Sequence, residues 1–501
     1  MKGVRKLIEE NELIENRLEK LKTLREKGAD PFAVERFDRS HTAMQLLTGA
    51  DEIGEQTVSA AGRVVSMRPM GKATFLHIQD STGRIQVYIK ADTVGAETYQ
   101  LLSLVDIGDF LGVEGSIGKT RTGETTIFAK GFEVLSKSLR PIPIGKQKGD
   151  QEWYGLQDVE QRYRQRYLDL IVNPEVMDTM VKRSIIVRAI RQFLDDEGFI
   201  EVETPVLQAV AGGAAAKPFD TYYNALNHEF HLRISLELYL KRLMVGGFDK
   251  VYEMGRVFRN EGLSTRHNPE FTLLELYQAY TNLEDMMDLV ERLFNNICQQ
   301  LYGGHTFSYN GETISLERPW KRIPLLESIR EHTGIGPEEF ETLESAKSAG
   351  VRLGLPMDEE NTIGGIVDKI FERFVQPKLI QPVFITEYPV DISPLAKKDP
   401  ANPGMTRRFE PYIAAYEVGN AFSQINDPLD QRERFIDQAR QRATGDAEAH
   451  PMDEDFLRAL EHGMPPTGGL GIGIDRLVML FTSSPSIRDV ILFPQLKPEK
   501  Q

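Results

Sequence analysis

The sequence has little cysteine and no long apolar run. Cys298 is the single cysteine among 501 residues, which excludes an internal disulfide framework and a cysteine-based zinc site and fits a reducing compartment. No run of about 18 uncharged apolar residues occurs, so no membrane span is expected. The first residues carry charges throughout, unlike a secretory signal peptide. These absences favour a soluble, cytoplasmic protein.

Basic residues are also too few for a generally basic surface. Lys and Arg number 60 against 75 Asp and Glu, a net charge of -15, which argues against a protein coated with positive charge for nucleic acid. The imbalance is regional, because residues 1–150 carry 22 basic and 21 acidic residues and the rest of the chain carries 38 and 54. The N-terminal part can therefore still bind RNA through local basic groups and stacking.

The chain begins with a helical pattern. Apolar residues recur at helical spacing over residues 5–27 with charges between them, which predicts an amphipathic helix that stops at Gly28. We expect this helix to dock on the protein or to stabilise a dimer. An alternative interpretation is that its basic residues between Lys20 and Lys27 contact RNA.

Short β-rich segments with turn signals between them follow from about residue 57. Five strands, with a helix at about 93–104 between the third and the fourth, are the order of an OB-fold barrel. A stretch rich in Pro, Gly and Lys then predicts a linker before an α+β region. The expected organisation is a helical extension at 1–50, the barrel at 51–140, the linker at 141–155, and an α+β domain at 156–501 with a mostly helical insertion around 320–395.

Two segments of the larger domain are weak signals when taken singly. A helix around 180–197 leads into GFIEVETPVL, a strand that ends at Pro205 and that alone indicates an ordinary helix–strand corner. Further on, glycine recurs every two residues from Gly469 to Gly473, which clears one face of a strand for a flat ligand, and Arg476 starts the next helix. The glycine spacing matches neither a dinucleotide fingerprint nor a Walker A loop.

A hairpin is predicted around RVFRNEGLSTRHNPEFTLLELY. Arg259 and Glu261 are two residues apart, so on a strand they share one face. Phe271, Glu275 and Tyr277 share a face of the second strand by the same spacing. A guanidinium, carboxylates and a stacking ring on one face suit a nucleotide beside a cationic ligand. The alternative, a solvated salt-bridge sheet, does not explain the aromatic ring.

A pair of glutamates lies in RRFEPYIAAYEVGNAFSQIND. If the chain folds back at Ile413 and Ala414, Glu410 and Glu417 face each other across a hairpin, with their Cβ atoms about 5 Å apart. Two carboxylates so close repel each other unless a cation neutralises them, which predicts a hard metal such as Mg²⁺. A pair of exposed glutamates is the alternative interpretation.

Taken in order, these segments resemble the three signature motifs of class II aminoacyl-tRNA synthetases. The proline-ending strand resembles motif 1, the Arg-x-Glu hairpin motif 2, and the glycine strand with Arg476 motif 3. An OB barrel in front of them is typical of the aspartyl, asparaginyl and lysyl subgroup. GGAAAKPF, ISLELYLKRLMVGGFDKVYEMGRVFRNEG and RHNPEFTLLELY resemble the lysyl-tRNA synthetases, over essentially the whole chain. The resemblance implies an antiparallel sheet flanked by helices, and a homodimer joined through motif 1.

The resemblance also implies roles in binding ATP. Arg259 would hold the α-phosphate and the amino-acid carboxylate, and Glu261 would bind the adenine amino group. Phe271 would stack under the adenine and Arg476 above it, where Arg476 also meets the γ-phosphate. His267 would assist at the phosphates, so that Arg259, Arg476 and His267 form the catalytic set. The further implied contacts are Asn268 and Gly473 for ATP, and Glu410 and Glu417 for Mg²⁺, of which more than one ion is expected.

Lysine and tRNA sites are implied in the same way. The lysine site would comprise Gly213, Glu237, Arg259, Glu275, Tyr277, Asn420, Phe422 and Gln424. In the barrel, Phe75 would stack on the central anticodon base and Gln86 would hydrogen-bond to it, with Arg68 and Glu124 as candidates for the flanking bases. A core position for Phe75 is the alternative. The implied reaction joins L-lysine to the 3′ hydroxyl of tRNA(Lys) through a lysyl-adenylate, without a covalent protein intermediate.

The sequence departs from the family pattern at the lysine site. Gln424 stands where the family usually has a glutamate that meets the substrate's ε-ammonium. Glutamine keeps an acceptor oxygen but loses the charge, and charged hydrogen bonds are roughly twice as strong as neutral ones. Lysine remains the expected substrate, with weaker binding or a lysine analogue left open. Smaller departures are Ala414 and Ala415, where glycines are frequent, and Lys217, where arginine is commoner.

Three other functions fit parts of this pattern. A ligase that adds lysine to a protein would resemble the catalytic domain alone, and the barrel argues against it. Specificity for aspartate or asparagine would need basic groups in the pocket, where Glu237 and Glu275 are acidic. A non-catalytic RNA-binding protein would be expected to lack Arg259, Arg476 or the glutamate pair, and all of them are present.

Overall fold

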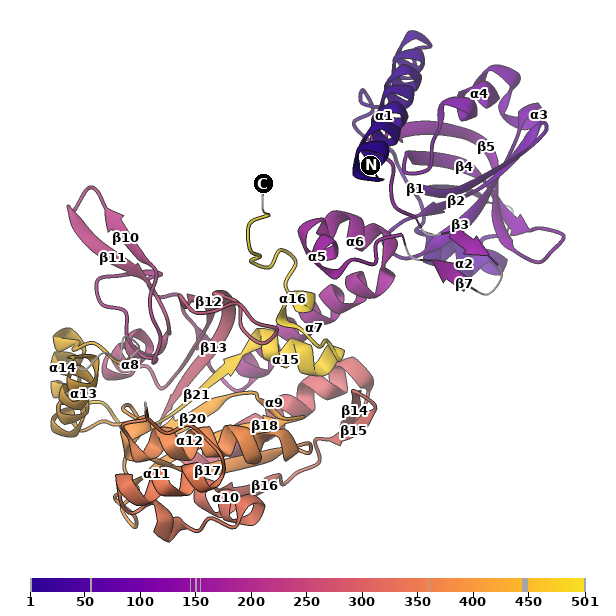
Figure 1. The fold of residues 1–501 in the computed structure, drawn as a ribbon. Coiled ribbons are helices and arrows are strands. Elements are labelled where there is room, and N and C mark those ends of the chain that lie inside the picture. The colour runs from indigo at the N-terminus through magenta and orange to yellow at the C-terminus, as the bar shows by residue number, and fades with distance from the viewer. Residues whose placement is uncertain are drawn as a thin grey trace. The chain divides into compact units, whose positions relative to one another are not determined.

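The computed structural model describes residues 2–54, 56–144, 146–148, 151–153, 155–358, 360–443 and 449–499. Contacts divide the chain into two compact units, Met1–Asp158 and Val159–Gln501, which we describe separately (Figure 1). Within the described ranges, no helix is both long enough and apolar enough to cross a membrane.

The smaller unit contains the predicted OB-fold barrel. Its strands close in the order β1-β2-β3-β5-β4, which confirms the fold. They are β1 (Thr57–Met70), β2 (Ala73–Gln79), β3 (Arg84–Lys90), β4 (Phe110–Lys119) and β5 (Thr125–Ser136). Alternate side chains such as Leu76, Ile78 and Val87 fill the interior, because successive residues of a strand point to opposite faces. In place of the single helix predicted before β4, the structure has three short helices, α3 (Ala91–Val94), α4 (Ala96–Gln100) and η1 (Leu101–Leu104).

Helix α1 (Lys2–Glu26) packs on the barrel, as the docking interpretation predicts. Leu24 is fully buried in the barrel's core cluster. Arg17 donates hydrogen bonds to the carbonyls of Ser138 (2.6 Å) and Ile107 (3.0 Å). A second helix, α2 (Ala43–Ile53), covers the barrel near β3 and β4 and begins with a capping box. Short strands β6 (Lys146–Lys148) and β7 (Gln151–Trp153) pair within the predicted linker.

The larger unit is built on one mixed, mostly antiparallel sheet, as the α+β prediction requires. Nine strands of its described residues form this sheet, in the order β16-β17-β18-β20-β21-β13-β12-β8 with β19 paired to β18. The strands are β8 (Ile200–Glu201), β12 (Lys250–Phe258), β13 (Glu270–Ala279), β16 (Lys321–Pro324), β17 (Val383–Pro389), β18 (Met405–Ile413), β19 (Tyr416–Glu417), β20 (Asn420–Ser423) and β21 (Thr467–Gly473). Two pairings, β8 with β12 and β16 with β17, are parallel.

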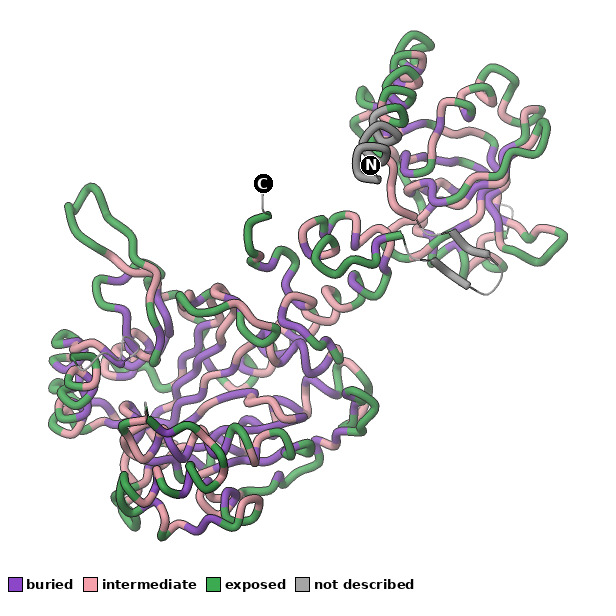
Figure 2. Tube along the Cα trace, viewed as in Figure 1, coloured by how far each residue is buried: buried purple, intermediate pink, exposed green. Residues whose placement is uncertain are grey.

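Helices cover both faces of this sheet, because Phe384 of β17 packs in one core cluster and its neighbours Val383 and Ile385 pack in another. Three of them, α7 (Pro174–Asp196), α9 (Leu283–Tyr302) and α15 (Ile474–Thr482), contribute to one apolar core with the central strands. Figure 2 shows buried residues following these strands and helices. The remaining elements are α5 (Val159–Arg164), α6 (Arg166–Val172), β9 (Leu207–Gln208), β10 (Asp220–Tyr223), β11 (His228–Leu232), α8 (Glu237–Val245), β14 (Thr306–Tyr309), β15 (Glu312–Ser315), α13 (Pro428–Ala443), α14 (Glu454–Glu461) and α16 (Ile487–Val490).

The region around 320–395 differs from the prediction of a mostly helical insertion. It contains α10 (Leu325–Thr333), η2 (Pro337–Phe340), α11 (Leu343–Arg352), α12 (Ile363–Phe374), η3 (Gln376–Lys378) and η4 (Val390–Ile392). Its first and last parts, however, are β16 and β17, which extend the main sheet. The apolar part of β17, Val383–Ile385, is too short to show a periodicity that separates a buried strand from a helix.

Motif 2 also differs from the expected hairpin in one detail. Strand β12 ends at Phe258, so Arg259 and Glu261 lie in the connecting loop rather than on a strand. The Arg259 N–H still donates to the carbonyl of Pro269 (2.8 Å), but the next N–H, that of Asn260, donates to the carbonyl of Lys217 (2.8 Å). The pairing of the two strands therefore ends at Arg259.

Candidate active site

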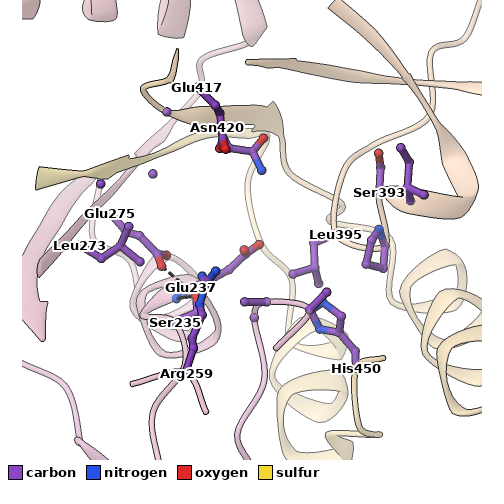
Figure 3. Close-up of a pocket in the computed structure, with 18 of the residues that line it drawn as sticks. Ser235, Glu237, Arg259, Leu273, Glu275, Ser393, Leu395, Glu417, Asn420 and His450 are labelled. Atoms are coloured by element: carbon purple, nitrogen blue, oxygen red, sulfur yellow. Dashed lines mark hydrogen bonds between the residues drawn. The ribbon is translucent and has the colours of Figure 1, made fainter. Parts of the chain in front are cut away.

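A cavity of about 930 Å³ opens in the larger unit beside strands β13, β20 and β21. Figure 3 shows Glu237, Glu275, Arg259 and Asn420 around its hollow. The predicted ATP and lysine residues lie in its wall, apart from Glu410. They are Gly213, Glu237, Arg259, Glu261, His267, Asn268, Phe271, Glu275, Tyr277, Glu417, Asn420, Phe422, Gln424, Gly473 and Arg476. The cavity therefore joins segments that are more than 260 residues apart in the sequence.

The glycines of β21 form part of the floor. Gly471 pairs with Glu275 on one side and with Asn420 on the other. A Cβ atom at Gly473 would meet nothing within 4 Å, so this glycine leaves the backbone open to a ligand. A Cβ atom at Gly469 would instead clash with Gln424 and Tyr277. Only part of the glycine stripe is therefore open, because side chains of the cavity already occupy the space over Gly469.

Arg259 and Phe271 lie together at one end of the cavity. The Arg259 guanidinium is 5.2 Å from the centre of the Phe271 ring, and its Nε donates to the carbonyl of Ile234 (3.3 Å). Burial lowers the pKa of Arg259, while Glu261 and Glu275 oppose that shift. A planar cation that is held against a ring and shielded from water is suited to bind an anion such as phosphate.

Arg476, His267 and Glu417 form a second polar cluster. Arg476 donates to Glu417 Oε2 (2.9 Å) and to His267 Nε2 (3.1 Å). Because Arg476 can only donate, His267 Nε2 must accept, which requires a neutral imidazole. Burial and the neighbouring Arg476 both lower the pKa of His267, in agreement with that assignment. Asn268 is used structurally, because its amide donates to the carbonyl of Glu270 (2.6 Å).

Glu275 lies in the acidic part of the same cavity and is near enough to Arg259 to oppose the lowering of its pKa. Its carboxylate accepts hydrogen bonds from Ser235 Oγ (2.7 Å), the backbone N–H of Leu236 (2.9 Å) and Tyr277 Oη (2.9 Å). Burial raises the pKa of Glu275 to about 7, and the charge of Glu237 adds to the rise. The group is thus fixed in position and ready to become a stable carboxylate when a cation arrives.

Glu237 and Lys241 form a buried pair beside Glu275. Lys241 Nζ is 2.7 Å from Glu237 Oε1, one helical turn along α8, without the angles of a good hydrogen bond. Burial raises the pKa of Glu237 and lowers the pKa of Lys241. Nearby, Gln424 Oε1 is buried and has no hydrogen-bond partner among the described residues. Unpaired buried acceptors are costly, so this end of the cavity is arranged to receive a donor.

The glutamate hairpin has a different register from the predicted one. The turn centres on Ala414 and Ala415, whose φ angles are 51° and 64°, and Glu417 pairs with Tyr412 rather than with Glu410. Positive φ at both central residues matches a two-residue turn of type I′. Moving the turn centre by one residue moves each partner by two, so both glutamates keep the same face.

Glu410 is enclosed by protein groups. It accepts hydrogen bonds from Tyr388 (2.8 Å) and Tyr412 (2.7 Å) and pairs with Arg408 (2.6 Å). Burial and the charge of Glu410 raise the pKa of Glu417. Within the described ranges, no group of three or more His, Cys, Asp or Glu is placed to hold a metal ion.

Several residues of the site were missed from the sequence. Ser235 orients Glu275, Lys241 pairs with Glu237, and Arg408 donates to the Asn420 side chain (3.1 Å). His450 also lines the cavity, and burial lowers its pKa to about 4. The four-residue spacing of Glu237 and Lys241 on a helix was the one signal that could have been found in the sequence.

The four predicted anticodon residues lie in the smaller unit. Phe75 and Gln86 are half-buried on the outer face of the barrel, whereas their neighbours Leu76 and Val87 fill its core. The alternative of a core position for Phe75 is therefore wrong. Gln86 Nε2 donates to Glu124 Oε2 (2.7 Å), and Arg68 pairs across the strands with Phe75.

Comparison with known proteins agrees with this architecture. The family described as "tRNA synthetases class II (D, K and N)" matches residues 158–497, and "OB-fold nucleic acid binding domain" matches residues 58–135. The lysine–tRNA ligase of Pelotomaculum thermopropionicum is 55% identical over 98% of this chain and 96% of its own length. Those of Carboxydothermus hydrogenoformans and Bacillus subtilis are 52% and 49% identical, over 97% of this chain and 98% and 97% of theirs. The chain therefore belongs to the lysine–tRNA ligases, within the class II tRNA synthetases of the D, K and N group.

Proposed function

We propose that this protein joins L-lysine to the 3′ end of tRNA(Lys), using ATP and a lysyl-adenylate intermediate. The observation that carries the proposal is the set of side chains that line one cavity of the larger unit. Arginines with an aromatic ring and buried carboxylates share its wall. A nucleoside triphosphate and a cationic amino acid therefore fit side by side, with the carboxylate of the amino acid toward the arginines.

The arginine end binds ATP. Phe271 and Arg476 enclose the adenine, and the loop residue Glu261 accepts from its amino group. Arg259 binds the α-phosphate and the lysine carboxylate together, which brings the two reacting groups within one guanidinium fork. His267 is neutral because Arg476 donates to its Nε2, and its Nδ1–H then donates to Ser264 Oγ (3.0 Å). His267 would assist at the phosphates by exchanging this serine for a phosphate oxygen.

The acidic end binds the lysine side chain. The ε-ammonium approaches Glu275 and the free Oε1 of Gln424, with Tyr277 and Phe422 as walls. An ammonium within hydrogen-bond distance favours the charged form of Glu275, which offsets the burial that raised its pKa. Arg408 fixes the Asn420 amide oxygen, so the Asn420 N–H groups remain for the substrate.

Catalysis needs no covalent protein intermediate. The lysine carboxylate attacks the α-phosphorus in line, pyrophosphate leaves, and the 3′ hydroxyl of the tRNA then attacks the mixed anhydride. The protein contributes positioning and the stabilisation of developing negative charge by Arg259 and Arg476. Positioning and charge stabilisation both require rigidly held arginines. The contacts of Arg259 with Ile234 and Phe271 hold its side chain in place.

Magnesium belongs at Glu417 and Glu410. Burial and then the charge of Glu410 raise the pKa of Glu417, and a divalent cation would relieve the repulsion between the two carboxylates. Bound there, Mg²⁺ would neutralise phosphate charge. Glu410 is already held by two tyrosines and Arg408. Glu417 pairs with Arg476 and can reorient toward a metal ion when that pair breaks.

A homodimer joined through motif 1 completes the proposal. Strand β8 is the last strand of the sheet and pairs only with β12, which leaves its other edge open among the described residues. Exposed apolar side chains surround this edge, including Ile200 (52% exposed), Leu207 and Val181. An apolar open edge suits pairing with a second copy. Light scattering should give twice the mass of the chain, and Ile200→Asp should give a monomer.

The barrel reads the anticodon in this proposal, and the reaction takes place in the cytoplasm. Phe75 stacks on the central base and Gln86 hydrogen-bonds to its edge, while Arg68 and Glu124 lie beside the flanking bases. Stacking of one base contributes roughly 1–3 kcal/mol. The barrel also separates this protein from a ligase that would add lysine to a protein.

Charging of total tRNA with each labelled amino acid tests the proposal. Lysine should be incorporated into acid-precipitable, alkali-labile material, and aspartate and asparagine should not. Incorporation of lysine into protein instead of tRNA, or into neither tRNA nor protein, would contradict the proposed function.

A further inference from the structure

The outer face of the barrel carries two parallel rows of side chains. The first row crosses β1, β2, β3 and β5 through the register pairs of Arg68, Phe75, Tyr88 and Phe128. The second row lies two residues away and comprises Ser66, His77, Gln86 and Thr126. Residues between the rows, such as Leu76 and Val87, point into the core. The two rows therefore lie on the same, outer side of the strands, and all their members except the buried Thr126 contribute to the surface.

The first row is mainly aromatic. The Phe75 and Tyr88 ring centres are 4.6 Å apart, and those of Tyr88 and Phe128 are 5.8 Å apart. These rings are half-buried on the outer face, where a planar base can lie on them. Aromatic stacking accepts any base, so this row supplies affinity without sequence preference.

The second row is joined by a chain of hydrogen bonds that passes through Glu124. His77 Nδ1 is 2.8 Å from Ser66 Oγ, and His77 Nε2 is 2.9 Å from Glu124 Oε1. The other oxygen of Glu124 accepts from Gln86 Nε2 (2.7 Å). Gln86 Oε1 in turn accepts from Thr126 Oγ1 (2.8 Å), and Thr126 is fully buried.

These contacts fix the donors and acceptors of the chain. Glu124 can only accept, so His77 Nε2 carries a proton, and in the neutral ring Nδ1 then accepts from the Ser66 hydroxyl. The orientation of the Gln86 amide follows, with its nitrogen toward Glu124 and its oxygen toward Thr126. One N–H of Gln86 and the outward lone pairs of Glu124 are left for a ligand. His77 is 33% exposed and Glu124 is 48% exposed, so both can be reached.

We propose that His77 is a positioning residue for anticodon recognition: its imidazole holds Glu124, and through Glu124 holds Gln86, in the arrangement that reads a base edge above the aromatic row. This inference rests on the proposed function, because it takes the ligand of the barrel to be tRNA. A flexible Glu124 would have to be ordered when RNA binds, and that ordering lowers affinity and discrimination. Preorganisation by His77 removes this loss.

Variants at position 77 of the full-length protein test the inference. His77→Phe keeps the ring and removes both hydrogen bonds, whereas His77→Gln keeps a donor that can reach Glu124. We expect His77→Phe to raise the KM for tRNA in aminoacylation about tenfold, as for the loss of a hydrogen bond to a charged group, with kcat unchanged. His77→Gln should restore most of the loss. A tRNA transcript with a substituted central anticodon base should be discriminated less well by His77→Phe.

Controls separate this inference from the proposed function and from misfolding. His41→Phe is matched, because His41 also contacts a serine in the same unit, Ser40 (2.7 Å), and it should leave the KM for tRNA unchanged. Lysine-dependent ATP–pyrophosphate exchange uses only the larger unit and should be normal in each variant. Loss of exchange in the unaltered protein would overturn the proposed function.

The outcome that overturns the inference itself is specific. Normal exchange together with an unchanged KM for tRNA in His77→Phe would show that His77 does not position Glu124. An equal rise of KM in His77→Phe and Glu124→Gln, with no further rise in the double variant, would support it. If His77→Phe fails to fold, the KM for tRNA of Ser66→Ala tests the inference instead. We expect this KM to rise about threefold, and an unchanged KM would overturn the inference.

Discussion

The two recognition surfaces of this protein use the same side chains in opposite environments. On the barrel, Glu124 is half exposed and each of its carboxylate oxygens is hydrogen-bonded to a neighbour. In the cavity, Glu275 is buried, and burial raises its pKa to about 7. The glutamines differ likewise: Gln86 Oε1 accepts from Thr126, whereas Gln424 Oε1 has no partner among the described residues.

This difference shows how each surface obtains specificity. The barrel has its polar groups satisfied and preorganised, so a base adds contacts to a finished surface. The cavity leaves an acceptor unpaired and a carboxyl half-protonated, so it is complete only when a cation enters. Substitutions of matched residues on the two surfaces should therefore affect different substrates.

The largest effect is expected at the phosphate-binding end of the cavity. Arg259→Ala should lower kcat/KM for lysine-dependent ATP–pyrophosphate exchange about 1000-fold, because a half-buried cation that faces the reacting groups is lost. Binding of tRNA, measured by filter retention, should change little. Arg432→Ala is the control, since Arg432 pairs with Glu454 on the surface of the same unit. A comparable loss in the control would show that the effect is not local.

A matched pair of carboxylates gives the next effect. Glu275→Gln should raise the KM for lysine about 100-fold, because the ammonium loses its charged partner in a buried site. Glu124→Gln should leave the KM for lysine unchanged and raise the KM for tRNA. Steady-state exchange and aminoacylation measure the two constants. The comparison fails if Glu124→Gln also weakens lysine binding.

The dependence on pH follows from the raised pKa of Glu275. Lysine binding needs the carboxylate, so kcat/KM for lysine should fall about tenfold from pH 8 to pH 6, with a midpoint near 7. Glu275→Gln should lose this dependence. Stability has the opposite sign: the folded-state pKa exceeds the ordinary 4.5, so the contribution of Glu275 to the free energy of unfolding is lost as pH rises through about 7. If kcat/KM for lysine does not change between pH 6 and pH 8, Glu275 is not the group that binds the ammonium.

The smallest effect is expected at the departure from the family pattern. Gln424→Glu should lower the KM for lysine about fivefold, because a charged acceptor replaces a neutral one beside the ammonium. Gln86→Glu, the matched change on the barrel, should leave the KM for lysine as it was. An unchanged or raised KM in Gln424→Glu would show that position 424 does not meet the ammonium.

Much of the fold and the site follows from local sequence patterns. The alternation in ATFLHIQD and GRIQVYIK predicts barrel strands because each has one buried face. The even spacing of Phe271, Glu275 and Tyr277 correctly places them on one face of β13, in the cavity. These features depend on a few neighbouring residues, so the sequence alone contains them.

What the sequence did not predict depends on contacts made elsewhere. Asn260 bonds to Lys217, more than 40 residues away, so the strand pairing stops after the hydrogen bond of Arg259 to Pro269. The hairpin register depends on which two residues form the turn, and Ala414 and Ala415 give no glycine signal. His77 was missed although it lies two residues from Phe75, because the role proposed for it depends on Glu124, which is 47 residues away in the sequence.

Lysine-dependent ATP–pyrophosphate exchange by the purified protein tests the central claim most directly. With each standard amino acid offered singly, we predict that lysine stimulates exchange above all others and that Arg259→Ala abolishes the stimulation. Exchange that does not respond to lysine, or that responds more strongly to aspartate or asparagine, would contradict the account.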